Sequence, residues 1–266
     1  MNKSAEQPVA IVMAKFPSPG QVKSRLCMGV ALTPVEAADV ARLMLRCVVT
    51  RVSRRWPTIV ATSPDDELPA MESILADLDQ ANAVEVIGQG RGTLGHRMDR
   101  IWEAYGGQQG IAFFGGDAPD IPDRYFDLVD SFLSNEKDDL AALGGAPDGG
   151  YWTLVSKRYA PQLLEGIPWS SDAVFSVTCQ RIHQLGHQPV IFPDWPDVDT
   201  FDDLKKLYHR LSESQGEGVR INKSFKPGLS GYDETLMRVM ESLHKGIGRL
   251  ISDDATFHSQ PQSDES

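Results

Sequence analysis

Short apolar runs, separated by longer segments with helical spacing, constrain the fold of this 266-residue chain more than any other feature. Each run is short enough for a buried strand. The runs are PVAIVMA (8–14), TIVATS (58–63), AVEVI (83–87), GIAFFG (110–115), LAALGG (140–145), YWTLV (151–155) and PVIF (189–192). Between most of them, segments such as 34–52 repeat apolar residues every three or four positions. This alternation predicts an α/β fold in which a mostly parallel sheet lies between two layers of helices.

The length and the end of this pattern predict the domain organisation. A chain with 41% apolar residues can bury a complete core, and one α/β domain of this size is common. Helical spacing continues through 200–212 and then loosens, so we expect one domain at 1–212 and a tail at 213–266. The tail is predicted to contain a linker at 213–230, an amphipathic helix at 233–251 and a disordered polar end at 252–266.

The charge balance limits the partners of the chain. Its 26 basic and 37 acidic side chains give a formal charge of −11, which disfavours an extended nucleic acid but allows a small anionic ligand. Cys27, Cys47 and Cys179 are too few and too widely spaced for a disulfide scaffold, so reduced thiols are expected. The N-terminus lacks an apolar signal segment and no run is long enough to span a bilayer, which predicts a cytoplasmic protein.

The loop after the first apolar run, AKFPSPGQVKSRL, is the first candidate site. It carries Lys15, Lys23 and Arg25, and it ends before a helix whose start is marked by Thr33 and Pro34. Open α/β sheets bind ligands at the carboxyl ends of their strands, so three cations at this place favour phosphate binding. The alternative is a solvated basic turn. Neither GxxxxGK[ST] nor GxGxxG is present, which removes the main support for a P-loop or a Rossmann dinucleotide site.

A second candidate, FFGGDAPDIP (113–122), places an acid directly after an apolar strand and two glycines. Asp117 would emerge at the edge of the sheet, where its carboxylate could hold Mg²⁺ or Mn²⁺. Asp117 could instead cap a turn, a role that Asp often has. The paired glycines favour the first reading, because they permit close approach of a ligand.

Two further motifs are rich in aspartate. In PDWPDVDTFDDL (193–204), Thr200 can cap a helix whose first turn contains Asp202 and Asp203, which explains those two acids. Asp199 precedes the cap, so we expect it to be free to supply a second carboxylate opposite the first metal ligand. In APDGGYWTLV, Asp148 precedes two glycines, a sequence that is typical of a tight turn.

Six motifs, taken together and in order, closely resemble one family. They cover the chain from about Pro8 to about Leu211, and the family is a bacterial group of GT-A-type glycosyltransferase-like proteins, often labelled radical-SAM/selenodomain-associated transferases. The motifs are MAKFPSPGQVKSRL, GQGRGTLGHRM, GGDAPDIP, GGAPDGGYWTLV, IPWSSDAVFSVT and DVDTFDDL.

The resemblance implies a three-layer nucleotide-diphospho-sugar transferase (GT-A-like) fold, shared with guanylyltransferases of molybdenum cofactor and phospholactate metabolism and with the cytidylyltransferase of isoprenoid synthesis. It also implies a role for each matching residue. Asp117 would bind the metal, and Asp148 and Asp199 would share its catalytic role, Asp199 also as a metal ligand. The residues implied to contact the nucleotide and its phosphates are Ala14, Lys15, Gly20, Lys23, Arg25, Gly92, Gly95 and Arg97. Tyr151 and Trp169 match motif positions on the implied acceptor side.

The chain departs from the family pattern at five polar positions. Gly116 and Ala118 stand where serines usually flank the metal-binding acid, and Cys47, Thr93 and His96 stand where acids are usual. These changes could alter metal affinity or acceptor choice, or mark a member that binds a nucleotide without efficient turnover.

The resemblance predicts a metal-dependent glycosyltransferase that uses a nucleotide-sugar donor, Mg²⁺ or Mn²⁺ and an acceptor that the sequence does not specify. Nucleotidyltransferases of this fold usually carry a longer Gly-rich first loop, and KFPSPGQVKSRL lacks that pattern, which favours glycosyl transfer. Two alternatives stay open: a nucleotidyltransferase that acts on an NTP and releases pyrophosphate, and a non-catalytic nucleotide-binding protein.

Overall fold

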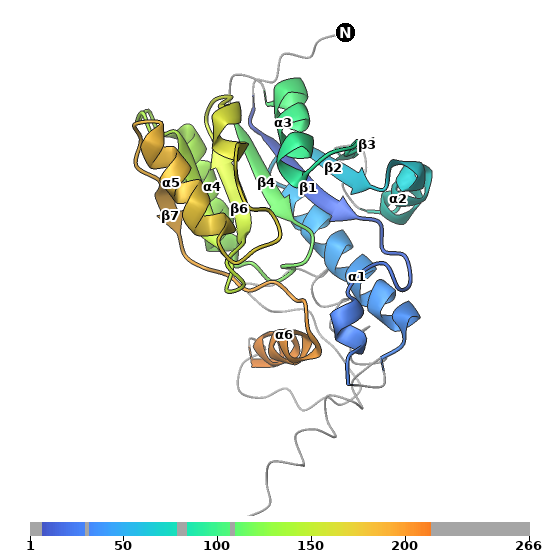
Figure 1. Cartoon of the computed structure of the whole chain (residues 1–266). Helices are drawn as coiled ribbons and strands as arrows, with labels where there is room; N and C mark the ends of the chain where they lie inside the picture. Colours follow the sequence, from blue (N-terminus) through green and yellow to red (C-terminus); the bar gives the residue numbers. More distant parts are fainter. Residues whose placement is uncertain (1–6, 30–31, 79–83, 107–109, 214–266) are drawn as a thin grey trace, which may run out of the picture.

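The computed structural model describes residues 7–29, 32–78, 84–106 and 110–213 (Figure 1). The linker predicted at 213–230, the amphipathic helix predicted at 233–251 and the polar end at 252–266 lie outside the described residues, apart from Glu213. Within the described part, every predicted apolar run forms a strand. The strands are β1 (Val9–Lys15), β2 (Thr58–Ser63), β3 (Val84–Gly88), β4 (Ile111–Gly115), β5 (Ala141–Gly145), β6 (Tyr151–Ser156) and β7 (Val190–Phe192).

These strands form one sheet in the order β3-β2-β1-β4-β6-β5-β7. The pairs β1–β2, β1–β4, β2–β3 and β5–β7 are parallel, whereas β6 runs antiparallel to both of its neighbours. The mostly parallel sheet is thereby confirmed. The strand order reverses between β1 and β4, because β2 and β3 extend the sheet on one side of β1 and β4 on the other. Open α/β sheets bind their ligands at such a reversal, outside the carboxyl ends of the strands.

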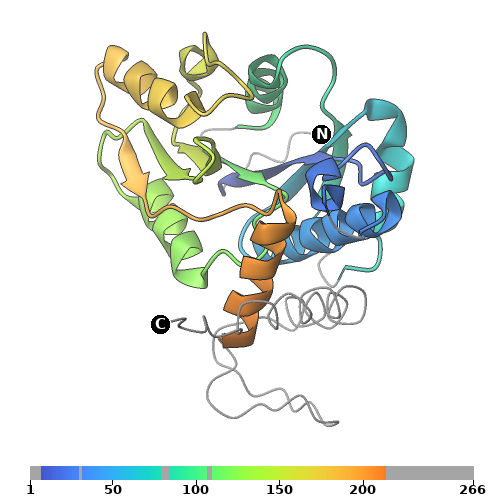
Figure 2. The same ribbon diagram turned by 60° about the horizontal axis from the view of Figure 1, so that its bottom comes forward.

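Helices cover both faces of the sheet and create two cores, which confirms the three-layer arrangement (Figures 1 and 2). On one face lie α1, α2 and α4, and on the other lie α3, η4 and α5. Alternating strand residues supply the two cores: Ala10 and Val12 face the first, whereas Ile11 faces the second. The helices are η1 (Ser24–Cys27), α1 (Pro34–Ser53), η2 (Asp65–Glu67), α2 (Leu68–Leu75), α3 (Leu94–Tyr105), α4 (Asp123–Ser134), η4 (Pro161–Leu164), α5 (Val174–Gln184) and α6 (Phe201–Glu213).

Helix α6 lies outside the two main cores and packs against η1 and the outer side of α1 (Figure 2). Leu204 and Leu207 of α6 are fully buried against Leu26 and Met44. Burial of side chains of this size contributes about 1.5–3 kcal/mol each. The helix therefore anchors the segment that precedes it, residues 193–200, next to the loop that follows β1.

The sequence explains where α1 and α6 begin. Thr33 and Glu36 form the predicted capping box at α1, with Pro34 at the first helical position. Thr200 and Asp203 make the equivalent reciprocal bonds at α6. Of the helices that the structure describes, none is both long and apolar enough to cross a membrane.

Candidate active site at the carboxyl edge of the sheet

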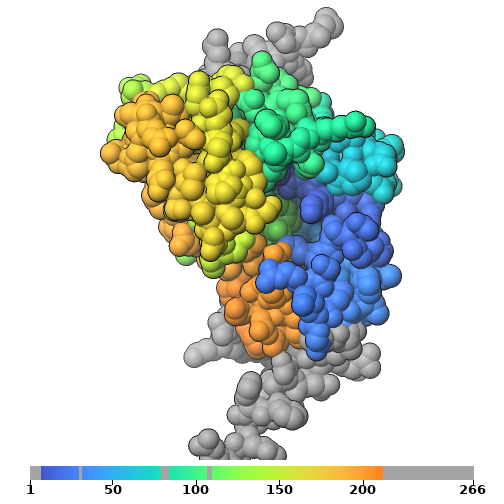
Figure 3. All heavy atoms as spheres, viewed as in Figure 1, coloured from blue at the N-terminus to red at the C-terminus, as the bar shows by residue number. Residues whose placement is uncertain are grey.

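The topology brings every loop with a predicted site residue to one edge of the sheet. Strands β1, β4, β5 and β7 end there, and the antiparallel β6 begins there with Tyr151. The long loop after β1, the acid after β4, the 146–150 turn and the 193–200 segment are consequently neighbours in space. Figure 3 shows this face hollowed between the N-terminal residues in blue and the segment around 150–175 in yellow.

The loop after β1 is shaped by one turn and one unusual backbone conformation. Pro19 and Gly20 occupy the centre of a turn in which Gln21 N–H donates to Ser18 O, and Gly20 has φ 76°. A positive φ at this position requires glycine or a similar residue. Lys23 then adopts the left-handed conformation, with φ 48°, without being glycine. Such strained residues are characteristic of functional sites.

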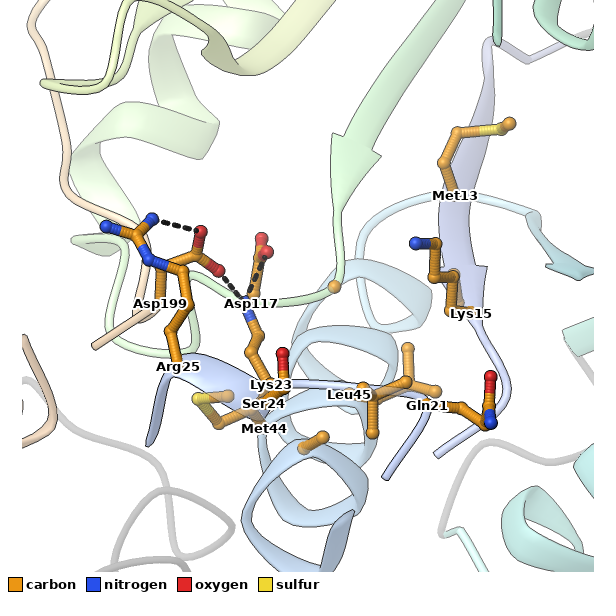
Figure 4. A pocket seen from close by; sticks show the side chains of 14 residues that line it. Met13, Lys15, Gln21, Lys23, Ser24, Arg25, Met44, Leu45, Asp117 and Asp199 are labelled. Carbon is orange, nitrogen blue, oxygen red and sulfur yellow. Dashed lines mark hydrogen bonds and ion pairs between the residues drawn. The ribbon is translucent and has the colours of Figure 1, made fainter. Parts of the chain in front are cut away.

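The ammonium group of Lys23 lies between two carboxylates that come from distant parts of the chain (Figure 4). Lys23 Nζ is 2.9 Å from Asp117 Oδ2 and 2.6 Å from Asp199 Oδ1. Burial of Lys23 disfavours its charge, but Asp117 and Asp199 outweigh that effect and raise the pKa of Lys23 above its usual value. Arg25 Nη1 approaches the other oxygen of Asp199 at 3.4 Å and is more exposed. The structure thus joins two predicted phosphate contacts to the two predicted metal ligands.

A third carboxylate completes this cluster. Asp117, Asp197 and Asp199 each present a carboxylate oxygen within 4.8 Å of the others. Burial, together with repulsion from Asp117, Asp148 and Asp199, raises the pKa of Asp197 to about 6. Carboxylate oxygens are the ligands that Mg²⁺ and Mn²⁺ prefer, and three of them concentrate negative charge in a small volume. The residues present therefore fit a divalent cation.

Asp197 lies in the motif PDWPDVDTFDDL, and the sequence did not assign it a role. The signal was available, because residues two apart in an extended segment point to the same side. Asp197 and Asp199 have this spacing, and Val198 N–H between them donates to Asp117 O over 3.0 Å. That backbone bond places the acid after β4 beside the acids after β7.

Two cavities meet at the carboxylate cluster. We call the first the basic cavity. It has a volume of about 410 Å³ and lies between the end of β1, the loop after β1 and α1 (Figure 4). Three cations (Lys15, Lys23 and Arg25) line it, with only Asp117 and Asp199 as acids. Ala14 also lines it. Its location matches the sequence prediction for the phosphates of a nucleotide.

We call the second the acidic cavity. It has a volume of about 540 Å³ and lies between the 146–150 turn, the 168–174 loop and residues 197–199. Among the described residues, Arg25 is the sole cation that lines it, whereas its carboxylates come from Asp117, Asp148, Asp172, Asp197 and Asp199. Tyr151 and Trp169, which were expected on the acceptor side, also line it. Because Arg25, Asp117 and Asp199 line both cavities, the carboxylate cluster forms their shared wall.

Four predicted contact residues do not line either cavity in the described structure: Gly20, Gly92, Gly95 and Arg97. Gly20 serves the turn before Lys23. Gly92 also has a positive φ, 109°, where glycine is favoured. At Gly95, a Cβ would lie 2.6 Å from Trp169 Nε1, so this glycine permits the close packing of Trp169 on α3. Each glycine therefore has a local structural reason.

Arg97 reaches the basic cavity through a buried glutamine that the sequence did not single out. Arg97 Nη1 donates to Gln89 Oε1 over 3.1 Å, and Gln89 Nε2 donates to Ala14 O and Ala61 O. Gln89 is 6% exposed. The pair supports the end of β1, which lines the basic cavity.

The loop after Asp117 is held by two arginines that sequence reasoning also missed. Arg51 of α1 donates to Pro119 O and to Ile121 O. Arg210 of α6 pairs with Asp120, which is 0% exposed and also accepts a bond from Trp195 Nε1. These contacts tie the loop after β4 to α1, to α6 and to the 193–200 segment.

Packing accounts for the departures at three positions around Asp117. A Cβ at Gly116 would lie 3.0 Å from Leu45 Cδ1. Ala118 is buried in the core on the α1 face, where a hydroxyl would need a partner. Cys47 is buried too, and its Sγ is 3.5 Å from Pro119 O. These changes replace polar groups with packing rather than with another ligand.

The departures from acids on α3 also have a structural account. Thr93 is the N-cap of α3 and accepts a bond from His96 N–H. The His96 ring is 3.1 Å from the Thr93 hydroxyl. Neither residue lines a cavity in the described structure.

The comparisons with known proteins support the fold. The protein family described as "Uncharacterized protein conserved in bacteria (DUF2064)" matches residues 47–171. None of the curated proteins matches the sequence. A crystal structure from Desulfovibrio desulfuricans G20, provisionally described as a nucleotide-diphospho-sugar transferase, is 26% identical, with a TM-score of 0.72 over 92% of this chain and 97% of that one.

Two more distant structures share the fold alone. CMP:2-keto-3-deoxy-manno-octonic acid synthetase, complexed with CTP, is 13% identical, and the 4-diphosphocytidyl-2C-methyl-D-erythritol synthase of Anaerococcus prevotii DSM 20548 is 12% identical. Each has a TM-score of 0.50 and aligns 78% of this chain with 99% of its own. The fold is an α/β fold of the nucleotide-diphospho-sugar transferase type. The chain belongs to the GT-A-like nucleotide-diphospho-sugar transferase superfamily.

Proposed function

We propose that this chain is a metal-dependent glycosyltransferase that binds a nucleotide-sugar donor in the basic cavity and its acceptor in the acidic cavity. The observation that carries the proposal is the shared wall: Asp117 and Asp199 line both cavities and meet Lys23 there. A donor diphosphate on the basic side would place its sugar at this wall. The group to be transferred would then face the second cavity.

The charges of the basic cavity suit a diphosphate leaving group. Lys15, Lys23 and Arg25 can donate charge-assisted hydrogen bonds to phosphate oxygens, which are stronger than neutral ones. A divalent cation bound by Asp117, Asp197 and Asp199 would add positive charge where negative charge develops on the leaving group. Lys23 lies between two of these carboxylates, Asp117 and Asp199, and donates a hydrogen bond to each.

In the proposed transfer, an acceptor hydroxyl oxygen forms a bond to the anomeric carbon of the donor sugar. The bond from that carbon to the diphosphate breaks, and its electron pair leaves with the nucleoside diphosphate. The hydroxyl proton passes to a carboxylate of the acidic cavity. Asp148 lines the cavity outside the metal cluster and is the proposed acceptor of that proton.

Nucleotidyl transfer is the second candidate, because the synthetase and synthase with the same fold act in cytidine nucleotide chemistry, as their names state. In that reaction an acceptor oxygen attacks the α-phosphate of an NTP and pyrophosphate leaves. The basic cavity could hold either donor. The products distinguish the two reactions: a nucleoside diphosphate for glycosyl transfer, and pyrophosphate for nucleotidyl transfer.

The test is a thermal-shift panel of UDP-, GDP-, CDP- and ADP-sugars and of NTPs, each with and without Mn²⁺. We expect one nucleotide class to raise the melting temperature by a few degrees, because a ligand that binds the folded state stabilises it. The rise should be larger with Mn²⁺. Nucleotide binding that is unchanged when the divalent metal is chelated would support a non-catalytic nucleotide-binding protein instead. If none of the compounds shifted the melting temperature, the proposal that the chain binds a nucleotide would be wrong.

A further inference from the structure

The acidic cavity has a composition that selects against one common class of acceptor. Five aspartates line it, and its sole lining cation, Arg25, is already within 3.4 Å of Asp199. Asp148 and Asp172 line the acidic cavity but not the basic one. A phosphate group brought in by the acceptor would meet Asp148 and Asp172, the two lining carboxylates outside the proposed metal cluster, and would be repelled by them.

The same cavity has surfaces that suit a sugar ring. Trp169 and Tyr151 line it and make an edge-to-face contact with ring centroids 6.4 Å apart, and the exposed Leu94 lies on the same wall. Aromatic and aliphatic side chains can pack against the C–H faces of a sugar. The hydroxyl of Tyr151 is buried and has no hydrogen-bond partner among the described residues. Carboxylates accept hydrogen bonds from hydroxyls, and each has several lone-pair sites.

Two walls of the acidic cavity, the 146–150 turn and the 168–174 loop, are fixed by direct contacts between their backbones. Gly149 has φ 86°, and a Cβ there would lie 2.0 Å from Asp172 O, so the 146–150 turn touches the 168–174 loop backbone to backbone. Phe175 N–H also donates to Gly149 O over 2.8 Å. The two loops that carry Asp148, Trp169 and Asp172 are thus held against each other by backbone contacts.

We infer that the acidic cavity takes a polyhydroxylated acceptor that carries no phosphate, namely a neutral or amino-bearing sugar or polyol. The role of this ligand as the acceptor rests on the proposed function. The preference of the cavity for ligands without phosphate can be measured by binding alone, without turnover. It also favours glycosyl transfer over formation of a nucleotide-sugar from a sugar phosphate. In the latter reaction the acceptor must bring a phosphate to this wall.

Matched pairs that differ only in phosphate give the test. Saturation-transfer NMR would be recorded on the full chain with mannose against mannose 1-phosphate, and with glucosamine against glucosamine 6-phosphate. At low salt, repulsion by nearby carboxylates should make the signal of the phosphate ester weaker by about fivefold or more. Raising the ionic strength should reduce the difference, because salt screens it.

Variants assign the signals to a cavity. Trp169→Ala should remove the signal of the unphosphorylated sugar, and Trp169→Phe, which retains a ring, should keep most of it. Asp172→Asn should strengthen the phosphate-ester signal, whereas Asp66→Asn, which changes the net charge equally at an exposed position of η2, should not. A phosphate-ester signal that persists in Trp169→Ala belongs to the basic cavity and leaves the inference intact.

Two outcomes would overturn the inference: phosphate esters that bind at least as well as the free sugars in a Trp169-dependent way, or free sugars that give no signal. UDP, GDP, CDP and ADP titrated into the same samples report on the proposed function separately. Sugar binding without nucleotide binding would contradict the donor site and support the acidic cavity. Nucleotide binding with Trp169-dependent phosphate esters would do the reverse and point to nucleotidyl transfer.

Discussion

The basic and acidic cavities lie side by side at one edge of the sheet and differ mainly in charge. The first is lined by three cations and two carboxylates, and the second by one cation and five carboxylates. Their sizes are similar, about 410 and 540 Å³. We propose that this difference in charge sorts the two substrates, with an anionic donor on the basic side and an acceptor without phosphate on the acidic side. The carboxylates of the shared wall, with Lys23 between them, separate the two.

The largest expected effect comes from breaking the shared wall at Asp117. Asp117→Asn should lower the transfer rate of the best donor by about 100-fold or more, since charge stabilisation at a leaving group is a large term. It should also abolish the Mn²⁺-dependent part of the nucleotide thermal shift. Asp194→Asn, on the same side of the sheet but lining neither cavity in the described structure, is the control. An unchanged metal response in Asp117→Asn would contradict the assignment.

The next effect tests the support of the wall rather than its ligands. Arg210→Met leaves Asp120 buried without its cation, which costs about 3 kcal/mol, or roughly 6–10 °C in melting temperature. Both cavities should lose affinity together, because Asp120 holds the loop after Asp117. Thermal unfolding of Arg210→Met against Lys206→Met, an exposed cation on the same helix, measures the effect. Equal melting temperatures for the two variants would show that the Asp120 pair supports little.

A smaller effect separates the two roles of Lys23. Lys23→Met should weaken binding of a nucleoside diphosphate about tenfold, since it removes a charge-assisted contact. It should also strengthen Mn²⁺ binding in the absence of nucleotide, because the ammonium group no longer lies between Asp117 and Asp199. Lys15→Met removes a cation that is not hydrogen-bonded to those acids, so it should weaken nucleotide binding and leave Mn²⁺ binding unchanged. Calorimetric titration of Mn²⁺ and nucleotide measures both; weaker Mn²⁺ binding in Lys23→Met would contradict this role.

The smallest effect concerns stability and pH. Burial and the neighbouring carboxylates raise the pKa of Asp197 to about 6. The charged carboxylate therefore destabilises the folded protein above this pH, and the destabilisation is absent below the usual pKa of an aspartate. Asp197→Asn should therefore stabilise the metal-free protein at pH 8, by about 1 kcal/mol after allowance for partial exposure, or about 2–4 °C. The gain should vanish near pH 4. A gain that is the same at both pH values would show that charge is not its cause.

Much of the fold could be predicted from local patterns. All the strands found in the described residues correspond to short apolar runs, and the capping box of α1 is readable as Thr33, Pro34 and Glu36. These features depend on residues close together in the sequence. The antiparallel direction of β6 and the position of α6 against α1 depend on long-range packing, and no local pattern specified them.

The candidate site was predictable where one motif carried both residue type and position, as for Lys23 and Asp117. It was not predictable where a contact joins distant segments. Asp120 and Arg210 are 90 residues apart, and Gln89 reaches Ala14 from 75 residues away. Gly95 is a different case: its motif predicted a ligand contact, and the structure adds a packing constraint, because a Cβ there would lie 2.6 Å from Trp169 Nε1. A motif indicates that a position requires a certain residue type, and the three-dimensional contacts are needed to identify the reason.

Anomalous diffraction tests the central claim most directly. Crystals grown with Mn²⁺ and the best-binding nucleoside diphosphate would be measured at the manganese edge. The account predicts one strong peak at Asp117 and Asp199, with the diphosphate against Lys23 in the basic cavity and no phosphate in the acidic cavity. A peak elsewhere, or a diphosphate seated beside Asp148 and Trp169, would contradict it.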